Sequence, residues 1–431
     1  MHIRLLGCLS LMLLVPATDT PDARAHLTAL RAKGKQARES KDWSALQAIA
    51  REQAEFLNNS ARSLESLALA SAQAGDRKTA LQALGDFVAM GEADDALVTT
   101  PQLDALKGTP EFVAILKRME QNKTAVREAT EVAQFHDAQL VPEDLDYDPQ
   151  SKTFFVTSVL QKKIVRFGLD GGQSDFAIAP DGWPMMAIRI DAPRGLVWAT
   201  EAALDTFVSV PAKDWGKSAV LCFRLSDAKL LHRVDGPPHS ALGDMVLTKE
   251  GDVIVADGEG GGIYRVRHEA SEKSDSTAIE RLDAGDFISP QTPALHPDGR
   301  HLFVPDYLRG IGILDPANKK VAWVQTDRRF TLHGIDGLYF KNGTLIAVQN
   351  GTSPERVVSV RLNADLDRVD SETVIERATP TLGDPTHGVV VGDDFFYIAN
   401  SGWDSLQDDG ALKPNAKMTP ARLMKAVLKK P

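Results

Sequence analysis

Cysteine is scarce in this sequence: its 431 residues include only Cys8 and Cys222. If Cys8 is removed with a signal peptide, Cys222 has no partner and no intramolecular disulfide can form. The stretch VLCFRL around Cys222 is typical of a buried strand, and no histidine stands near it in the sequence. A Cys/His zinc pattern, a Gly-x-Ser-x-Gly elbow and a glycine-rich phosphate loop opening a helix are also missing. If the chain is secreted, the lack of disulfides fits a bacterial periplasm better than a eukaryotic exterior.

A surplus of positive charge is lacking as well. The formal net charge is −10 at pH 7, and no cluster of lysine and arginine is interleaved with aromatic residues. An acidic balance disfavours binding to nucleic acid or to anionic membranes, so we expect no nucleic-acid partner.

The apolar run at residues 5–15 is shorter than the roughly 20 residues that a membrane-spanning helix needs, so we do not expect an integral membrane protein. Arg4 precedes this run and Val15-Pro16-Ala17 follows it, a pattern that predicts a signal peptide at residues 1–17 cut after Ala17. The expected location is therefore the periplasm or the exterior of a bacterium. A lipoprotein is disfavoured because most of the apolar run follows Cys8.

Residues 20–124 are rich in alanine, leucine and charged residues and predict a small all-α domain. Apolar residues recur at helical spacing on both sides of Gly75-Asp76, as in a helical hairpin that resembles a degenerate tetratricopeptide repeat. Thr109-Pro110 predicts the start of another helix. This domain serves either as a structural cap on the next domain or as a groove for a protein partner.

From about residue 130 the pattern changes to short strands separated by Asp, Gly and Pro. One plan of strand, turn and strand recurs six times, beginning near residues 142, 183, 243, 293, 335 and 386. A radial arrangement buries both faces of every unit, so residues 130–402 predict a six-bladed β-propeller; an open solenoid would have about half this period. Residues 130–138 are a candidate closing strand. Residues 403–431 predict a tail with a short amphipathic helix at 419–430.

The first strand of each propeller blade lines the central channel, so polar residues at the starts of those strands should converge. These starts are Glu143-Asp144, Pro184-Met185, Gly243-Asp244, Gln291-Thr292, Asp336 and Thr386-His387. Several carboxylates around one axis repel one another unless something neutralises them. Either a divalent cation with oxygen ligands or a network of channel waters would do so, and Ca²⁺ is the favoured cation, with Zn²⁺ and Mn²⁺ as alternatives.

The phrases VPEDLDYDP, SPQTPALHPDGRHLFVPDY and HGIDGLYFKNG give residues 131–402 a resemblance to the senescence marker protein/gluconolactonase/luciferin-regenerating enzyme family. The resemblance implies a six-bladed propeller with a divalent metal in its channel and hydrolysis of lactones or esters. It implies Glu143, Gln291 and Asp336 as metal ligands, with Gln291 in place of the family's Asn. Where the family has a substrate-binding Arg and Asn, this sequence has Ala241 and Gly243.

By the same resemblance Asp336 would be the general base and the metal the Lewis acid. His387 is a candidate proton shuttle or substrate contact, while Asp244 and Thr292 are candidate substrate-binding residues. Two further functions stay open: a non-catalytic propeller that binds a peptide, glycan or protein, and a former enzyme that keeps its metal for stability. No feature names the substrate.

Overall fold

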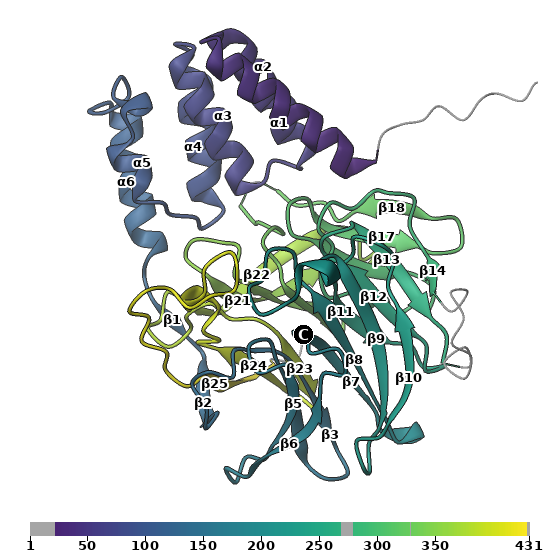
Figure 1. Ribbon diagram of the computed structural model, residues 1–431. Helices are drawn as coiled ribbons and strands as arrows, with labels where there is room; N and C mark the ends of the chain where they lie inside the picture. Colours follow the sequence, from purple (N-terminus) through teal and green to yellow (C-terminus); the bar gives the residue numbers. More distant parts are fainter. Residues whose placement is uncertain (1–21, 269–278, 328, 429–431) are drawn as a thin grey trace, which may run out of the picture.

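The computed structural model describes residues 22–268, 279–327 and 329–428. It confirms the predicted fold class: a six-bladed β-propeller preceded by a helical region, which lies against one end of the propeller (Figure 1). The predicted signal peptide lies outside the described residues. Within them, no helix combines the length and the apolar composition that crossing a membrane requires.

The described part of the helical region contains six α-helices. They are α1 (Ala23–Glu39), α2 (Trp43–Phe56), α3 (Ala61–Gln73), α4 (Arg77–Ala89), α5 (Ala96–Thr99) and α6 (Pro110–Asn122). The predicted hairpin is α3 and α4: Gly75 turns the chain at φ +81°, and the Asp76 side chain caps α4 by accepting from the Thr79 amide at 3.1 Å. The Thr109 hydroxyl caps α6 by accepting from the Phe112 amide at 3.3 Å.

Six antiparallel sheets form the blades in the described chain. The first three are β3 (Pro142–Asp148), β4 (Thr153–Ser158), β5 (Lys163–Phe167) and β6 (Gln173–Ile178); β7 (Met185–Asp191), β8 (Leu196–Ala203), β9 (Lys217–Arg224) and β10 (Leu230–Asp235); and β11 (Leu242–Leu247), β12 (Val253–Asp257), β13 (Gly262–Val266) and β14 (Ile279–Arg281).

The fourth blade is β15 (Ala294–Leu295), β16 (Leu302–Asp306), β17 (Gly310–Asp315) and β18 (Lys320–Trp323). The fifth is β19 (Gly337–Lys341), β20 (Thr344–Gln349), β21 (Arg356–Leu362) and β22 (Val369–Arg377), with β1 (Val126–Arg127) added at its edge. The sixth is β23 (Gly388–Val391), β24 (Asp394–Ala399), β25 (Arg422–Val427) and β2 (Ala129–Gln134).

The second strand of each blade is almost wholly buried, because a blade packs against a neighbour on each face. LVWATEAA in β8, LFVPD in β16 and TLIAVQ in β20 illustrate the pattern. Continuous apolar runs of this kind, punctuated by turns, are what made the six units visible in the sequence. First strands of neighbouring blades contact one another around the axis, as β3 does with β7 and β23.

The ring closes with strands from both ends of the propeller sequence. The predicted closing strand is confirmed as β2, which pairs antiparallel with β25. The predicted helix at 419–430 is wrong, since β25 is a strand that also pairs with β24. The propeller therefore extends past the expected boundary at 402. Leu423 and Met424 are good helix formers, but pairing on both edges and burial at the closure outweigh local propensity.

The helical region is anchored to the propeller by buried polar contacts. Arg356 of β21 is 1% exposed; it donates to the Met90 carbonyl at 3.0 Å and lies 3.7 Å from the Glu92 carboxylate. Gly91 is required beside it, because a Cβ there would meet the Arg356 guanidinium at 2.7 Å. The His333 ring also reaches across, with Nε2 3.1 Å from the Leu57 carbonyl oxygen.

Candidate functional site

The channel residues are aimed by a bulge repeated at the start of three inner strands. The pairing register shifts between Pro142 and Leu145 in β3, between Met185 and Ile188 in β7, and between Leu242 and Asp244 in β11. A bulge turns a side chain out of the regular alternation. Threonines of the second strands support two of the bulges: the Asp144 amide donates to the Thr157 hydroxyl at 3.0 Å, and the Ala187 amide to Thr200 at 3.0 Å.

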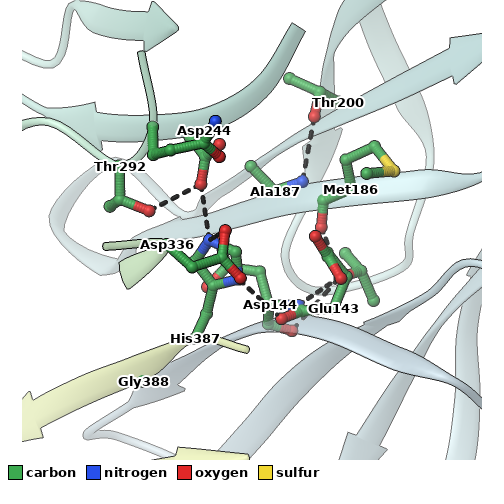
Figure 2. A network of polar contacts seen from close by, with 12 residues as sticks. Glu143, Asp144, Met186, Ala187, Thr200, Asp244, Thr292, Asp336, His387 and Gly388 are labelled. Atoms are coloured by element: carbon green, nitrogen blue, oxygen red, sulfur yellow. Dashed lines mark hydrogen bonds and ion pairs between the residues drawn. The ribbon is translucent and has the colours of Figure 1, made fainter. Parts of the chain in front are cut away.

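Two of the channel carboxylates are paired with cations. Asp144 accepts from Arg189 at 2.5 Å and from the Ile188 amide at 2.9 Å. Asp244 lies 2.5 Å from His387 Nε2 and accepts from the Thr292 hydroxyl at 2.6 Å. Figure 2 shows His387 between Asp244 and Asp336, with Glu143 and Asp144 beside them. Asp144 and Asp244 thus each have a positive partner. We call Asp144, Asp244, Thr292 and His387 the closed layer of the channel.

His387 carries a proton on both ring nitrogens. Its Nδ1 lies 2.9 Å from the Glu143 carbonyl oxygen, and its Nε2 faces the Asp244 carboxylate. Both neighbours accept hydrogen bonds, so both nitrogens must donate. Burial alone would lower the pKa of His387, but the carboxylates of Asp336 and Asp244 raise it well above its usual 6.5. His387 is therefore an imidazolium that neutralises the channel from within.

Glu143 and Asp336 are left without a full cationic partner, and both face a pocket of about 360 Å³. Gln291 and Thr386 line the same pocket, together with Ser289, Tyr307, Asn350, Asp384 and Trp403. The Thr386 hydroxyl is buried and has no hydrogen-bond partner among the described residues. Buried polar atoms are nearly always satisfied, so this hydroxyl is free to bond to water or to a ligand in the pocket.

Among the residues that the structure describes, each of the two carboxylates accepts hydrogen bonds through one oxygen only. The Trp403 indole donates to Glu143 Oε2. The Asn350 side-chain amide donates to Asp336 Oδ2 at 2.7 Å, and the Tyr307 hydroxyl in turn donates to Asn350 Oδ1 at 3.0 Å. The second oxygen of each carboxylate thus has a fixed orientation, and that of Asp336, Oδ1, lies 3.9 Å from His387 Nε2.

Burial dominates the electrostatics of this pair. It raises the pKa of Glu143 to about 8, an effect that His387 opposes and the charge of Asp336 reinforces. It raises the pKa of Asp336 to about 7, with His387 opposing and Asp244 reinforcing. The protein therefore holds two carboxyl groups where negative charge is costly, which a bound cation or a proton would relieve.

The structure brings together all the residues predicted from the sequence, in two layers. Glu143, Gln291 and Asp336 line the pocket, whereas Asp244, Thr292 and His387 lie behind it and are nearly inaccessible to solvent. Ligand atoms of Glu143, Asp336 and His387 lie within 4.8 Å of one another, as in a group that could hold a metal ion. Because both nitrogens of His387 are engaged, the two carboxylates are the members of this group that are open to an ion.

Sequence reasoning missed the residues that orient this pair. Asn350 and Tyr307 follow the ends of β20 and β16, and Trp403 lies in the loop after β24. Their sole shared signal is a position at a strand end on the side of the pocket. Arg189 was missed because its position within β7 does not reveal that it reaches Asp144 of another blade.

The helical region borders this pocket, because the loops that line the pocket also contact the helices. The Ile288 carbonyl beside Ser289 accepts from Arg24 at 3.3 Å. Arg309, two residues after Tyr307, places its guanidinium 4.5 Å from the Phe56 ring centre. Farther along, the Ser353 hydroxyl donates to the Ala93 carbonyl at 2.7 Å.

No family model matches the sequence, and a search of curated proteins finds no match. Among solved structures, luciferin-regenerating enzyme is 11% identical over 71% of this chain and 99% of its own, with a TM-score of 0.48. Virginiamycin B lyase from Staphylococcus aureus is 14% identical over 69% and 99%, with a TM-score of 0.47. A provisionally assigned gluconolactonase is 15% identical over 71% and 94%, with a TM-score of 0.43. Likeness at this level concerns the fold and carries no argument about activity.

Proposed function

We propose that the channel pocket binds one divalent cation, Ca²⁺ above all, and that the protein uses it outside the cytoplasm to hydrolyse lactones or esters. One observation carries the proposal: two buried carboxylates, whose nearest cation His387 is already bound to Asp244, converge with an unpartnered hydroxyl on one pocket. The residues present fit such an ion. Glu143, Asp336, the Gln291 amide and the Thr386 hydroxyl all offer oxygen, the donor that Ca²⁺ prefers. His387 is committed to Asp244, so a nitrogen ligand for Zn²⁺ is not free.

The bound cation would supply Lewis acidity toward a carbonyl oxygen. Asp336 would take the proton of the attacking water on Oδ1, because Asn350 holds its other oxygen. The Tyr307–Asn350 chain keeps that carboxylate in one orientation. His387, 3.9 Å from Asp336 Oδ1, would limit the cost of charge in the pocket without entering it. Glu143, tied to Trp403, would bind the cation without moving a proton.

The test is metal content by mass spectrometry, melting temperature with and without chelator, and a panel of lactones and esters. We expect one Ca²⁺ per chain and a melting temperature that falls on chelation. Glu143→Gln and Asp336→Asn should both lose the ion, and Asp336→Asn should lose turnover at least a hundredfold. Asp370→Asn, an exposed carboxylate outside the pocket, is the matched control. Protein that contains no metal and does not respond to chelator or added Ca²⁺ would overturn the mechanism.

A second candidate, binding without catalysis, is favoured by a groove in the helical region. The groove has a volume of about 400 Å³ and combines apolar Leu46, Ile49 and Leu69 with basic Arg31, Lys35 and Arg38; no acidic residue is among its described lining. In a protein of net charge −10, this basic rim suits an acidic segment of a partner. Capture of such a segment that survives Asp336→Asn but is lost in Lys35→Glu/Arg38→Glu would favour this function.

A further inference from the structure

A second cluster of metal-binding side chains lies on the turn between β15 and β16. His296, Asp298 and His301 belong to the sequence HPDGRH, and one ligand atom from each lies within 4.8 Å of the others. The turn follows β15, whereas Gln291 and Thr292 precede it, so this cluster and the channel pocket lie at opposite ends of the same strand. Asp315 at the end of β17 stands beside the cluster, with Oδ2 3.7 Å from His301 Nε2.

The carboxylate at the centre of this cluster is held in place by the backbone. Asp298 Oδ1 accepts from the amides of Arg300 at 2.8 Å and His301 at 3.0 Å. Asp298 Oδ2 contacts His301 Nδ1. Asp315 is held in the same way, through the Ala317 amide at 3.0 Å and the Asn318 side chain at 2.9 Å. Neither carboxylate has to be ordered when a ligand arrives.

The two imidazoles are oriented as well. The His296 ring packs against Phe303 with ring centres 4.8 Å apart, and against His301 at 5.7 Å. Both histidines direct Nδ1 toward Asp298. If His301 binds through Nδ1, its Nε2–H points to Asp315, the carboxylate–histidine arrangement that commonly supports a metal ligand.

His296 Nδ1 faces two groups of Asp298 that favour opposite proton states of the ring. His296 Nδ1 lies 3.3 Å from the Asp298 amide, which requires a lone pair on that nitrogen. The same nitrogen lies 3.0 Å from Asp298 Oδ1, which presents lone pairs of its own. A positive ion between the imidazoles and the carboxylate would satisfy all three groups, because each imidazole nitrogen and the carboxylate oxygen would then direct a lone pair at the cation.

We propose that this hairpin binds one divalent transition-metal ion, Zn²⁺ by its donor chemistry, through His296 Nδ1, His301 Nδ1 and Asp298 Oδ2, with Asp315 supporting His301. Two imidazoles and one carboxylate suit Zn²⁺, unlike the oxygen donors of the channel. The side chains remain accessible for loading: His296 is 13% exposed, His301 23% and Asp298 36%.

The ion would stabilise β15, the shortest first strand among the described blades. β15 contains only Ala294–Leu295 and pairs with β16 at those two positions. Closing its turn with a metal would hold β15 in place, and Gln291 and Thr292 of the channel lie just before this strand. Binding to the folded state alone also stabilises the protein by mass action.

The test is a titration of untagged protein with Zn²⁺ in saturating Ca²⁺, followed by calorimetry, by melting temperature and, with Co²⁺ as a probe, by visible absorption. We expect one ion per chain and a rise of several degrees in melting temperature. His301→Ala and His296→Ala should abolish both, whereas Asp315→Asn should weaken binding about tenfold. His136→Ala, an exposed histidine on another blade, and Glu143→Gln in the channel are the controls and should bind as the wild type does.

Equal binding by wild type and His301→Ala would overturn the proposal, and so would an absence of binding to folded wild-type protein. Zinc lost in Glu143→Gln but kept in His301→Ala would place the ion in the channel, which also rejects the hairpin site. Circular dichroism of each variant checks that the chain is folded, so loss of the ion cannot be mistaken for loss of structure.

Discussion

The channel and the interface between the helical region and the propeller both bury charge, but they handle it differently. At the interface Glu92 lies opposite Arg356, and the neutral His333 ring has a partner for each nitrogen. In the channel Asp144 and Asp244 each have a close cation, whereas Asp336 lies 3.9 Å from the His387 that Asp244 already binds, and no ion pair of Glu143 is found among the described residues. Both Glu143 and Asp336 line the open pocket. Balanced charge in an interior serves structure, whereas surplus charge on a pocket wall indicates a ligand.

The largest effect should come from breaking the balance at the interface. Arg356→Met leaves the Glu92 carboxylate buried with its cation removed, and we expect the free energy of unfolding to fall by about 3–5 kcal/mol in urea denaturation. Arg329→Met is the control, since its pair with Asp327 is 73% and 47% exposed and should contribute less than about 1 kcal/mol. A loss as small as the control's would show that Arg356 does not anchor the helical region.

The pH dependence of the interface tests the neutral state of His333. Burial lowers the pKa of His333 to about 4, while the unfolded chain titrates near 6.5. Between these values the unfolded chain takes up a proton that the folded protein refuses, so stability declines as the pH falls from 6.5 toward 4. At pH 5 the loss from this group is about 2 kcal/mol.

His333→Gln isolates that contribution, because its amide can still donate to the Leu57 carbonyl and does not titrate. We expect the variant to lose less stability than the wild type between pH 7.5 and pH 5 in urea denaturation. Identical pH profiles would mean that His333 is protonated in the folded protein or plays no part in holding the interface.

The smallest expected effect is the difference in stability between two valine variants, one at Thr386 on the pocket wall and one at Thr292 in the closed layer. Thr386→Val removes a hydroxyl that has no partner among the described residues, so stability without metal should hold or rise by up to about 1 kcal/mol. Affinity for the channel cation should fall. Thr292→Val removes a donor to Asp244 and should instead cost about 1–2 kcal/mol. Equal losses in both variants would contradict the distinction between the pocket wall and the closed layer.

Much of the fold was predictable because it depends on patterns of residues that are close together in the sequence. Turn residues between apolar runs marked the six units, and Gly75-Asp76 marked the helical hairpin. The final strand was not predictable from its own residues. The stretch RLMKAV has helical propensity, and its pairing partner β2 lies at the other end of the propeller sequence. Pairing over such a separation leaves no local signal.

The candidate site divides in the same way. Glu143, Gln291 and Asp336 could be chosen in advance because a resemblance and a position at strand starts both pointed to them. The proton state of His387 could not, since it depends on a carboxylate from one blade and a backbone carbonyl from another. Likewise HPDGRH was visible as a turn, but the direction of its two imidazoles was not.

The sequence by itself determined that this chain forms a ring of short strands behind a helical region, because apolar runs and turn residues act over a few positions. The tertiary structure alone decided which charges are neutralised and which remain. Neutralisation depends on distances of a few ångströms between residues of different blades, such as Asp244 and His387 at 2.5 Å. Those distances are set by closure of the ring, so no single stretch of sequence contains them.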